Sequence, residues 1–149
     1  MKNRRERGNS IIEFSLMTPW LILLFIGAMD WGFYAYALIA TEAAARVACL
    51  YTSSSVARAS DSDGACKYAI GQLNGMPNVG TAGVTTCGGA PVTLTATSVT
   101  GGASADGNQA SQVSVTYVTP VFVPMIWSGS TMLPKQVTIT RTIQMRVRG

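Results

Sequence analysis

The feature that most constrains this 149-residue chain is a long apolar run near its N-terminus. Asp30 is the only charged residue between positions 14 and 40. About 27 helical residues, at a rise of 1.5 Å each, extend roughly 40 Å and can cross the hydrocarbon core of a bilayer. The sequence therefore predicts a membrane-spanning helix followed by one small domain at most.

The residues before this run are basic and predict its orientation. Lys2, Arg4, Arg5 and Arg7 supply four of the 11 basic residues, and without the first eight positions the chain is close to neutral. By the positive-inside rule, the N-terminus stays in the cytoplasm and the rest is translocated. Because the remaining domain has no strong cluster of Lys and Arg, we expect no nucleic-acid partner.

The helix is expected to be longer than a membrane requires. Asn9 and Ser10 are both good N-cap residues, so the helix should begin at one of them and run to about Tyr51. A helix of about 40 residues extends roughly 60 Å, so its second half must leave the membrane and pack on a domain. Pro19 is either a tolerated membrane proline or a point where the helix can loosen.

The second half of the chain alternates between apolar and polar residues, as half-buried strands do. We therefore predict an α+β fold, in which the long N-terminal helix packs on a small antiparallel sheet of three or four strands. The expected elements are a short helix at 65–73 capped by Asp63, a candidate short strand at 84–87, and strands at 92–99, 112–118 and 136–147.

One apolar segment does not fit this pattern. Pro120 and Pro124 interrupt the stretch that includes Phe122 and Trp127, and proline is excluded from the centre of a sheet. Residues 122–127 could belong to the core, to an interface or to a ligand-binding patch.

Three cysteines would face an oxidising compartment in this orientation, so two can pair and one is left over. We favour a disulfide between Cys66 and Cys87, which closes a loop of about 20 residues. Cys49 lies near the end of the helix and is either a buried thiol or an alternative partner for one of the others. The chain has no histidine and no CxxC motif, so no metal site is expected.

The sequence offers little for catalysis. It has no histidine to act as a general base, no GxSxG motif and no phosphate-binding loop. The carboxylates Asp61, Asp63 and Asp106 of the domain fall in expected loops without an evident partner. We therefore expect no catalytic residues, no cofactor and no enzymatic activity, which leaves assembly as the predicted role.

The acidic residues of the apolar run are the best functional candidates, because a charge in a membrane is expensive. If the chain is cut after Gly8, the new α-amino group of Asn9 lies about one turn from Glu13, on the same or an adjacent chain. Such a pair is strong in a low-dielectric bundle, although desolvation opposes it. The alternative is a solvated or neutral acid at the membrane surface. Asp30, roughly 25 Å further along, is either an assembly residue or an ordinary boundary residue.

Residues 8–14, Gly-Asn-Ser-Ile-Ile-Glu-Phe, resemble the processing signature of type IV pilins and pseudopilins. That signature has a basic leader, a glycine before the cut and a glutamate fifth in the mature chain. More narrowly, the chain is similar to the TadE-like family of the tight-adherence (Flp) pilus systems. Residues 12–16, 27–32 and 43–46 carry this narrower resemblance.

The resemblance implies cleavage by a prepilin peptidase between Gly8 and Asn9, and assembly through Glu13, Phe14 and Asp30. The implied product is a minor pilin or pseudopilin with a leader at 1–8, an assembly helix at 9–51 and a small domain at 52–149. It would cross the inner membrane once, hold its domain in the periplasm and, after assembly, lie at the pilus or cell surface. Implied partners are membrane lipid, the assembly platform of the inner membrane, and other pilin-like subunits, either further copies or TadF- and TadG-like proteins.

Two alternatives stay open. The chain could be a membrane-tethered periplasmic binding module that does not polymerise and uses residues 122–127 as its contact loop. It could also be a pseudopilin of a type II secretion system. The mature N-terminus separates the first alternative from a pilin, because only a processed chain begins at Asn9.

Overall fold

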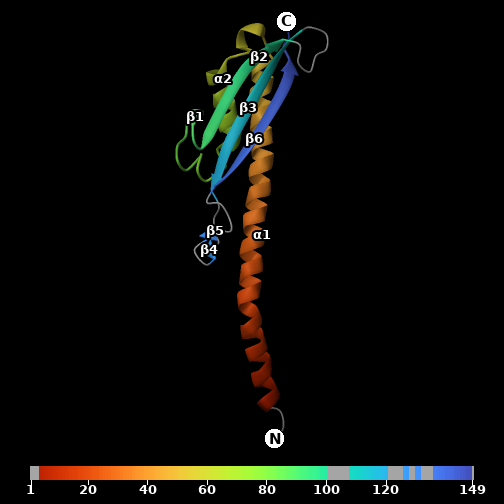
Figure 1. The fold of residues 1–149 in the computed structure, drawn as a ribbon, viewed down its shortest axis with the longest axis vertical. Coiled ribbons are helices and arrows are strands. Elements are labelled where there is room, and N and C mark those ends of the chain that lie inside the picture. Colours follow the sequence, from red (N-terminus) through yellow and green to blue (C-terminus); the bar gives the residue numbers. More distant parts are fainter. Residues whose placement is uncertain (1–3, 101–107, 121–125, 128–129, 132–135, 149) are drawn as a thin grey trace.

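The computed structural model describes residues 4–100, 108–120, 126–127, 130–131 and 136–148, with side chains described from residue 11 onward except at 126–127 and 130–131. A long helix is packed at one end against a four-stranded antiparallel sheet with strand order β1-β2-β3-β6 (Figure 1). The predicted α+β fold is confirmed. The elements are α1 (Arg4–Thr52), a 3-10 turn η1 (Val56–Arg58), α2 (Ser62–Leu73), β1 (Gly88–Gly89), β2 (Val92–Thr100), β3 (Gln109–Pro120), β4 (Ile126–Trp127), β5 (Ser130–Thr131) and β6 (Gln136–Arg146).

Helix α1 is longer than predicted, chiefly at its N-terminal end. It begins at Arg4 instead of Asn9 or Ser10, and ends at Thr52. Arginine and glutamate are strong helix formers, so residues 4–7 outweigh both the capping preference of Asn9 and the single glycine at position 8. The 49 residues extend roughly 74 Å. Only the half of α1 nearer its C-terminal end contacts the sheet, and the other half projects away from the domain (Figure 1).

The core of the domain lies between α1, α2 and the sheet. The face of α1 that enters it consists mainly of small side chains, which let the helix come close to β3 and β6. These buried α1 residues are Ala37, Ala40, Thr41, Ala44, Ala45, Ala48, Cys49 and Thr52. From the other side, Val115 and Tyr117 of β3 and Leu73 of α2 fill the space with larger buried side chains.

The sheet shows the predicted alternation. Val92, Leu94 and Ala96 of β2 are buried and alternate with exposed threonines, and the register pairs Leu94 with Val115 of the neighbouring strand. The opposite face is polar, and hydroxyl groups pair across it between β3 and β6. The Oγ1 atoms of Thr116 and Thr140 lie 3.0 Å apart, for example.

Two local predictions were wrong. The expected short strand at 84–87 is not formed, because the Val84 N–H donates to the Val79 carbonyl in a turn. The strand register with β2 begins at Gly88, and Cys87 contributes only its carbonyl, which accepts the Leu94 N–H. Helix α2 is capped by Asp61 and not by Asp63, so it begins at Ser62. The Asp61 carboxylate accepts the Gly64 N–H at 2.9 Å and also the Tyr51 hydroxyl at 2.8 Å. The hydrogen bond from Tyr51 of α1 therefore favours Asp61 over Asp63 as the N-cap of α2.

The cysteines occupy two different environments. Cys66 of α2 and Cys87, which precedes β1, form a disulfide with an S–S distance of 2.03 Å. This is the pair that the sequence analysis favoured. Cys49 is a free, buried thiol whose Sγ lies 3.6 Å from the carbonyl oxygens of Ser111 in β3 and Ile143 in β6. The disulfide fastens α2 to the sheet, while Cys49 fills space beneath it.

The interrupted apolar segment lies largely outside the described residues. Positions 121–125 are among those not described, so the roles considered for residues 122–127 stay predictions. Ile126–Trp127 and Ser130–Thr131 pair as the two short antiparallel strands β4 and β5.

The Asp61 cap should make stability depend on acidity. The Gly64 N–H, followed by the Tyr51 hydroxyl, lowers the pKa of Asp61 in the folded chain. The unfolded value is about 3.9, so this contribution is fully present above about pH 4 and is lost as the pH falls through the lower folded value. Asp61→Asn keeps a capping oxygen but cannot titrate. Urea unfolding of the detergent-solubilised chain should therefore show a smaller loss of stability for Asp61→Asn than for the wild type below about pH 4.

The control for this experiment is Asp63→Asn, which removes a carboxylate from the same turn but leaves the cap in place. It should behave like the wild type. Identical acid profiles for Asp61→Asn and the wild type would contradict the role given to the cap.

The disulfide should contribute a large share of the domain's stability. It closes a loop with a sequence separation of 21, and constraining a loop of this size in the unfolded chain is worth about 3 kcal/mol. Replacing both Cys66 and Cys87 by alanine should lower the free energy of unfolding by about that amount. The wild type in excess reductant should unfold at the same denaturant concentration as the variant, and a variant as stable as the oxidised wild type would refute the estimate.

Candidate assembly helix and processing site

The half of α1 that projects from the domain is apolar and uncovered. The stretch Ile11–Thr52 is long and apolar enough to cross a membrane, and none of its most apolar 18-residue window is buried in the chain. Phe14 is 68% exposed, as is Trp20. A core helix of a soluble protein would hide such side chains, so this surface needs lipid or another protein chain to cover it.

The predicted processing and assembly residues lie on neighbouring turns of α1. Gly8 and Asn9 are inside the helix, and Glu13 follows Asn9 by four residues, or about one turn. The side chains of Glu13 and Phe14 are exposed. Glu13 has no ion pair with any part of the chain that the structure describes. The helix thus presents a carboxylate close to the predicted cleavage point, with no cation from the described side chains to neutralise it.

Asp30 is separate from this group. It lies 17 residues beyond Glu13 on the same helix, which corresponds to roughly 25 Å. Its side chain is half-buried, and within the described residues it forms no ion pair. Gly27 and Gly32 stand on either side, and a Cβ added at either position would meet nothing within 4 Å. The structure therefore brings Gly8, Asn9 and Glu13 together and leaves Asp30 as a second, distinct position.

Pro19 lies between these two positions without ending the helix. Proline has no N–H, so the Ser15 carbonyl lacks its usual helical donor. The hydroxyls just before Pro19 are occupied: Ser15 donates to the Ile11 carbonyl and Thr18 to the Phe14 carbonyl, each at 2.8 Å. These bonds satisfy both hydroxyls within the helix, as an apolar environment requires.

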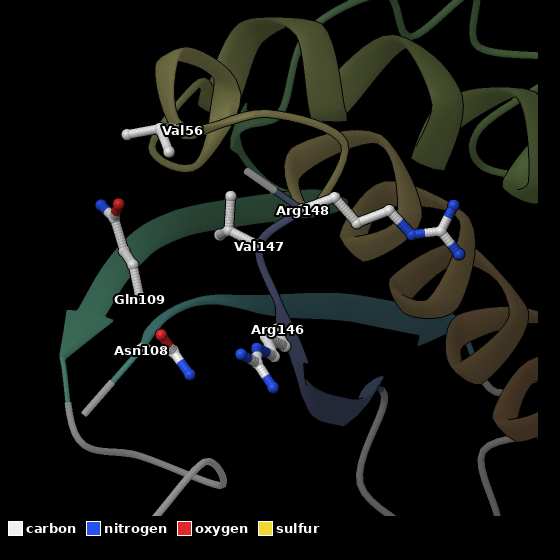
Figure 2. Close-up of a pocket in the computed structure, with 6 residues that line it drawn as sticks. All are labelled: Val56, Asn108, Gln109, Arg146, Val147 and Arg148. Atoms are coloured by element: carbon white, nitrogen blue, oxygen red, sulfur yellow. The ribbon is translucent and has the colours of Figure 1, made fainter. Parts of the chain in front are cut away.

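The described part of the domain was compared with the requirements of a metal site and of a ligand pocket. No cluster of three or more metal-ligating side chains occurs among the residues that the structure describes. A hollow of about 780 Å³ lies at the end of the domain that holds the C-terminus. Its arginines, Arg146 and Arg148, point in different directions (Figure 2), so they do not converge on one ligand atom.

A further group of charged residues lies in a groove between α1 and β6. Glu42 and Arg46 of α1 form the ion pair that their i,i+4 spacing predicts, at 2.5 Å, and Arg141 of β6 lines the same hollow. The position of Arg141 beside this pair was not predicted from the sequence. Arg141 is two residues from Ile139 and two from Ile143, so it lies on the same face of β6 as these residues, which face the helix. This alternation was the signal that the sequence contained.

The N-terminal part of the chain also resembles known proteins. Residues 8–49 match the family model of TadE-like proteins. The predicted resemblance is confirmed over this TadE-like segment, which begins at Gly8 and ends at Cys49, within α1. TadE-like proteins are associated with tight-adherence (Tad) pili, and the match covers less than a third of this chain. No curated protein and no solved structure matches the chain.

A test of Glu13 follows from its isolation. We predict that Glu13→Ala is still processed but assembles poorly, because removing one member of an ion pair buried between chains costs about 3–5 kcal/mol. The measurement is the fraction of the protein in sheared, pelleted filaments, together with its mature N-terminus. Asp63→Ala, which removes an exposed acid from α2, is the control and should assemble normally. Normal piliation by Glu13→Ala would refute the pairing.

Proposed function

We propose that this chain is a structural pilin-like subunit, a minor pilin or pseudopilin of a Tad-type pilus, cut after Gly8 by a prepilin peptidase. One observation carries the proposal. The exposed, membrane-length half of α1 continues directly into the half that packs on the sheet, inside a TadE-like segment that begins at Gly8. A simple membrane anchor needs only about 20 apolar residues, whereas this helix also forms part of the folded domain.

The proposed life cycle has two stages, which differ in what covers the exposed half of α1. Before assembly the chain crosses the inner membrane once, with the basic head in the cytoplasm and the domain in the periplasm, and lipid covers the helix. After assembly, neighbouring pilin-like subunits cover it. The partners in these steps are the prepilin peptidase, the assembly platform, further copies of the chain, and TadF- or TadG-like subunits.

Cleavage changes the electrostatics at the start of α1. Removing residues 1–8 takes away Lys2, Arg4, Arg5 and Arg7 together with Glu6. It leaves a single α-amino cation on Asn9, which can approach Glu13 of an adjacent chain without the rest of the basic head. In a bundle of low dielectric constant this pair is strong, and it favours chains that are correctly aligned. Processing therefore makes the exposed half of α1 competent for assembly.

The proposal is tested at the mature N-terminus. Mass spectrometry of the protein from the cells that produce it should give a chain that begins at Asn9. Gly8→Val places a branched side chain beside the scissile bond and should retain residues 1–8, which abolishes assembly because the basic head stays attached. Gly27→Val is the matched control, since it adds the same side chain elsewhere on α1 and should leave cleavage intact.

The outcomes discriminate between the candidate functions. A mature chain that begins at Asn9 and is present in sheared filaments supports the proposal. An intact leader in the wild-type protein would refute it and favour a membrane-tethered module that does not polymerise.

A further inference from the structure

The groove between α1 and β6 is a candidate docking surface. The hollow holding the Glu42, Arg46 and Arg141 side chains has a volume of about 590 Å³ and a floor that includes Ile143 and Met145. A smaller hollow of about 250 Å³ shares Glu42 and Arg46 and extends along α1 past Ile39. The two adjoin at Glu42 and Arg46 and together form a groove lined by both apolar and charged side chains.

The charges in this groove do not balance. Glu42 is already paired with Arg46 at 2.5 Å. The Arg141 guanidinium forms no ion pair or hydrogen bond with any described part of the chain. Two guanidinium groups and one carboxylate therefore line one hollow, and the two cations repel each other. A second carboxylate would balance the charge of the two guanidinium groups.

The position of Arg141 strengthens this reading. It lies at an inward-facing position of β6, in register with the buried Val115 of β3. Its neighbours of the same parity, Ile139 and Ile143, belong to or pack against the core. The Arg141 side chain itself is exposed, so its guanidinium is accessible to a partner from outside the chain.

Asp30 is the acid that fits. Among the acids with described side chains, Asp61 is held by Tyr51 and Gly64, Glu42 by Arg46, and Asp63 lies exposed at the start of α2. Glu13 is assigned to the α-amino group in the proposed function. Asp30 remains: it is half-buried and has no ion pair among the described residues, and it lies beside the apolar stretch, where an uncompensated charge is costly. Gly27, one turn away, leaves space there for another chain.

We propose that Asp30 of one copy docks in the α1–β6 groove of a second copy, where its carboxylate pairs with Arg141. The pair cannot form within one chain, because Asp30 lies 12 to 16 residues below Glu42 and Arg46 on a continuous helix, or roughly 18–24 Å. With the two copies parallel, as in the proposed filament, the contact displaces them by about that distance along α1. The contact also covers Ile39, which is 67% exposed in the single chain. The inference rests on the proposed function, since it needs copies that assemble.

Charge reversal tests the pair in filaments made by the full chain. Asp30→Arg alone and Arg141→Asp alone should each lower the assembled fraction about tenfold or more, because each juxtaposes like charges in the groove. The double variant restores opposite charges and should recover most of the wild-type assembly. Arg148→Asp, an equal change of charge at the far end of the domain, should have little effect. A double variant no better than the worse single variant would overturn the pair.

Cysteine cross-linking gives a readout that does not depend on yield. In filaments, Asp30→Cys combined with Arg141→Cys should form a disulfide between two copies, seen as dimers on non-reducing gels. Cys49 is buried and Cys66 is paired with Cys87, so neither site supplies a competing thiol. Asp30→Cys combined with Thr140→Cys is the matched control, because Thr140 lies on the opposite face of β6 and should not cross-link.

Other outcomes overturn the inference in distinguishable ways. If Glu13→Cys cross-links to Arg141→Cys more strongly than Asp30→Cys does, the acid in the groove is Glu13 and not Asp30. A cross-link to a different subunit would show that the occupant is not a second copy. Filaments that contain the processed double-cysteine chain without a cross-link would refute this contact but leave the proposed function intact. An unprocessed chain absent from filaments would refute both.

Discussion

The close packing of a small-residue face of α1 on the sheet is the interaction on which the rest of the structure depends. Ala44, Ala45 and Ala48 are fully buried, and with no long side chains they let the helix approach β3 and β6 directly. Tyr117 and Leu73 fill the remaining space around the helix. Because α1 is one continuous helix, this contact also fixes the direction of the exposed half. Domain and assembly helix are therefore one mechanical unit.

Much of this fold could be predicted from the sequence because its main signals are local. The apolar run and the small residues after it indicated one long helix, and alternation over 92–99 and 136–147 indicated strands facing that helix. The errors arose where contacts between residues distant in the sequence determine the local structure. Tyr51 donates to Asp61 and so favours a helix cap two residues earlier than Asp63. The turn that holds Val84 keeps residues 84–87 from forming a strand, although the Cys87 carbonyl still accepts the Leu94 N–H of β2 at 3.1 Å.

The same division applies to the candidate site. Gly8 and Glu13 stand out as candidates in the sequence, because a carboxylate after a basic head and beside an apolar run is unusual wherever the chain folds. The α1–β6 groove could not. Strand parity places Arg141 on the inward face of β6, but only the packing of α1 on β6 shows that it shares a hollow with Glu42 and Arg46. Its charge imbalance is a property of tertiary structure.

The alignment of β3 and β6 with the upper part of α1 (Figure 1) has a mechanical consequence. In the proposed filament, tension pulls on the domain through the N-terminal half of α1. Since the strands run along the helix, that pull acts in shear, and many side-chain contacts carry it at once instead of opening one after another. The Cys66–Cys87 disulfide then secures α2 to the sheet behind the loaded interface. A subunit built this way can pass force from one neighbour to the next without its domain being peeled from the helix.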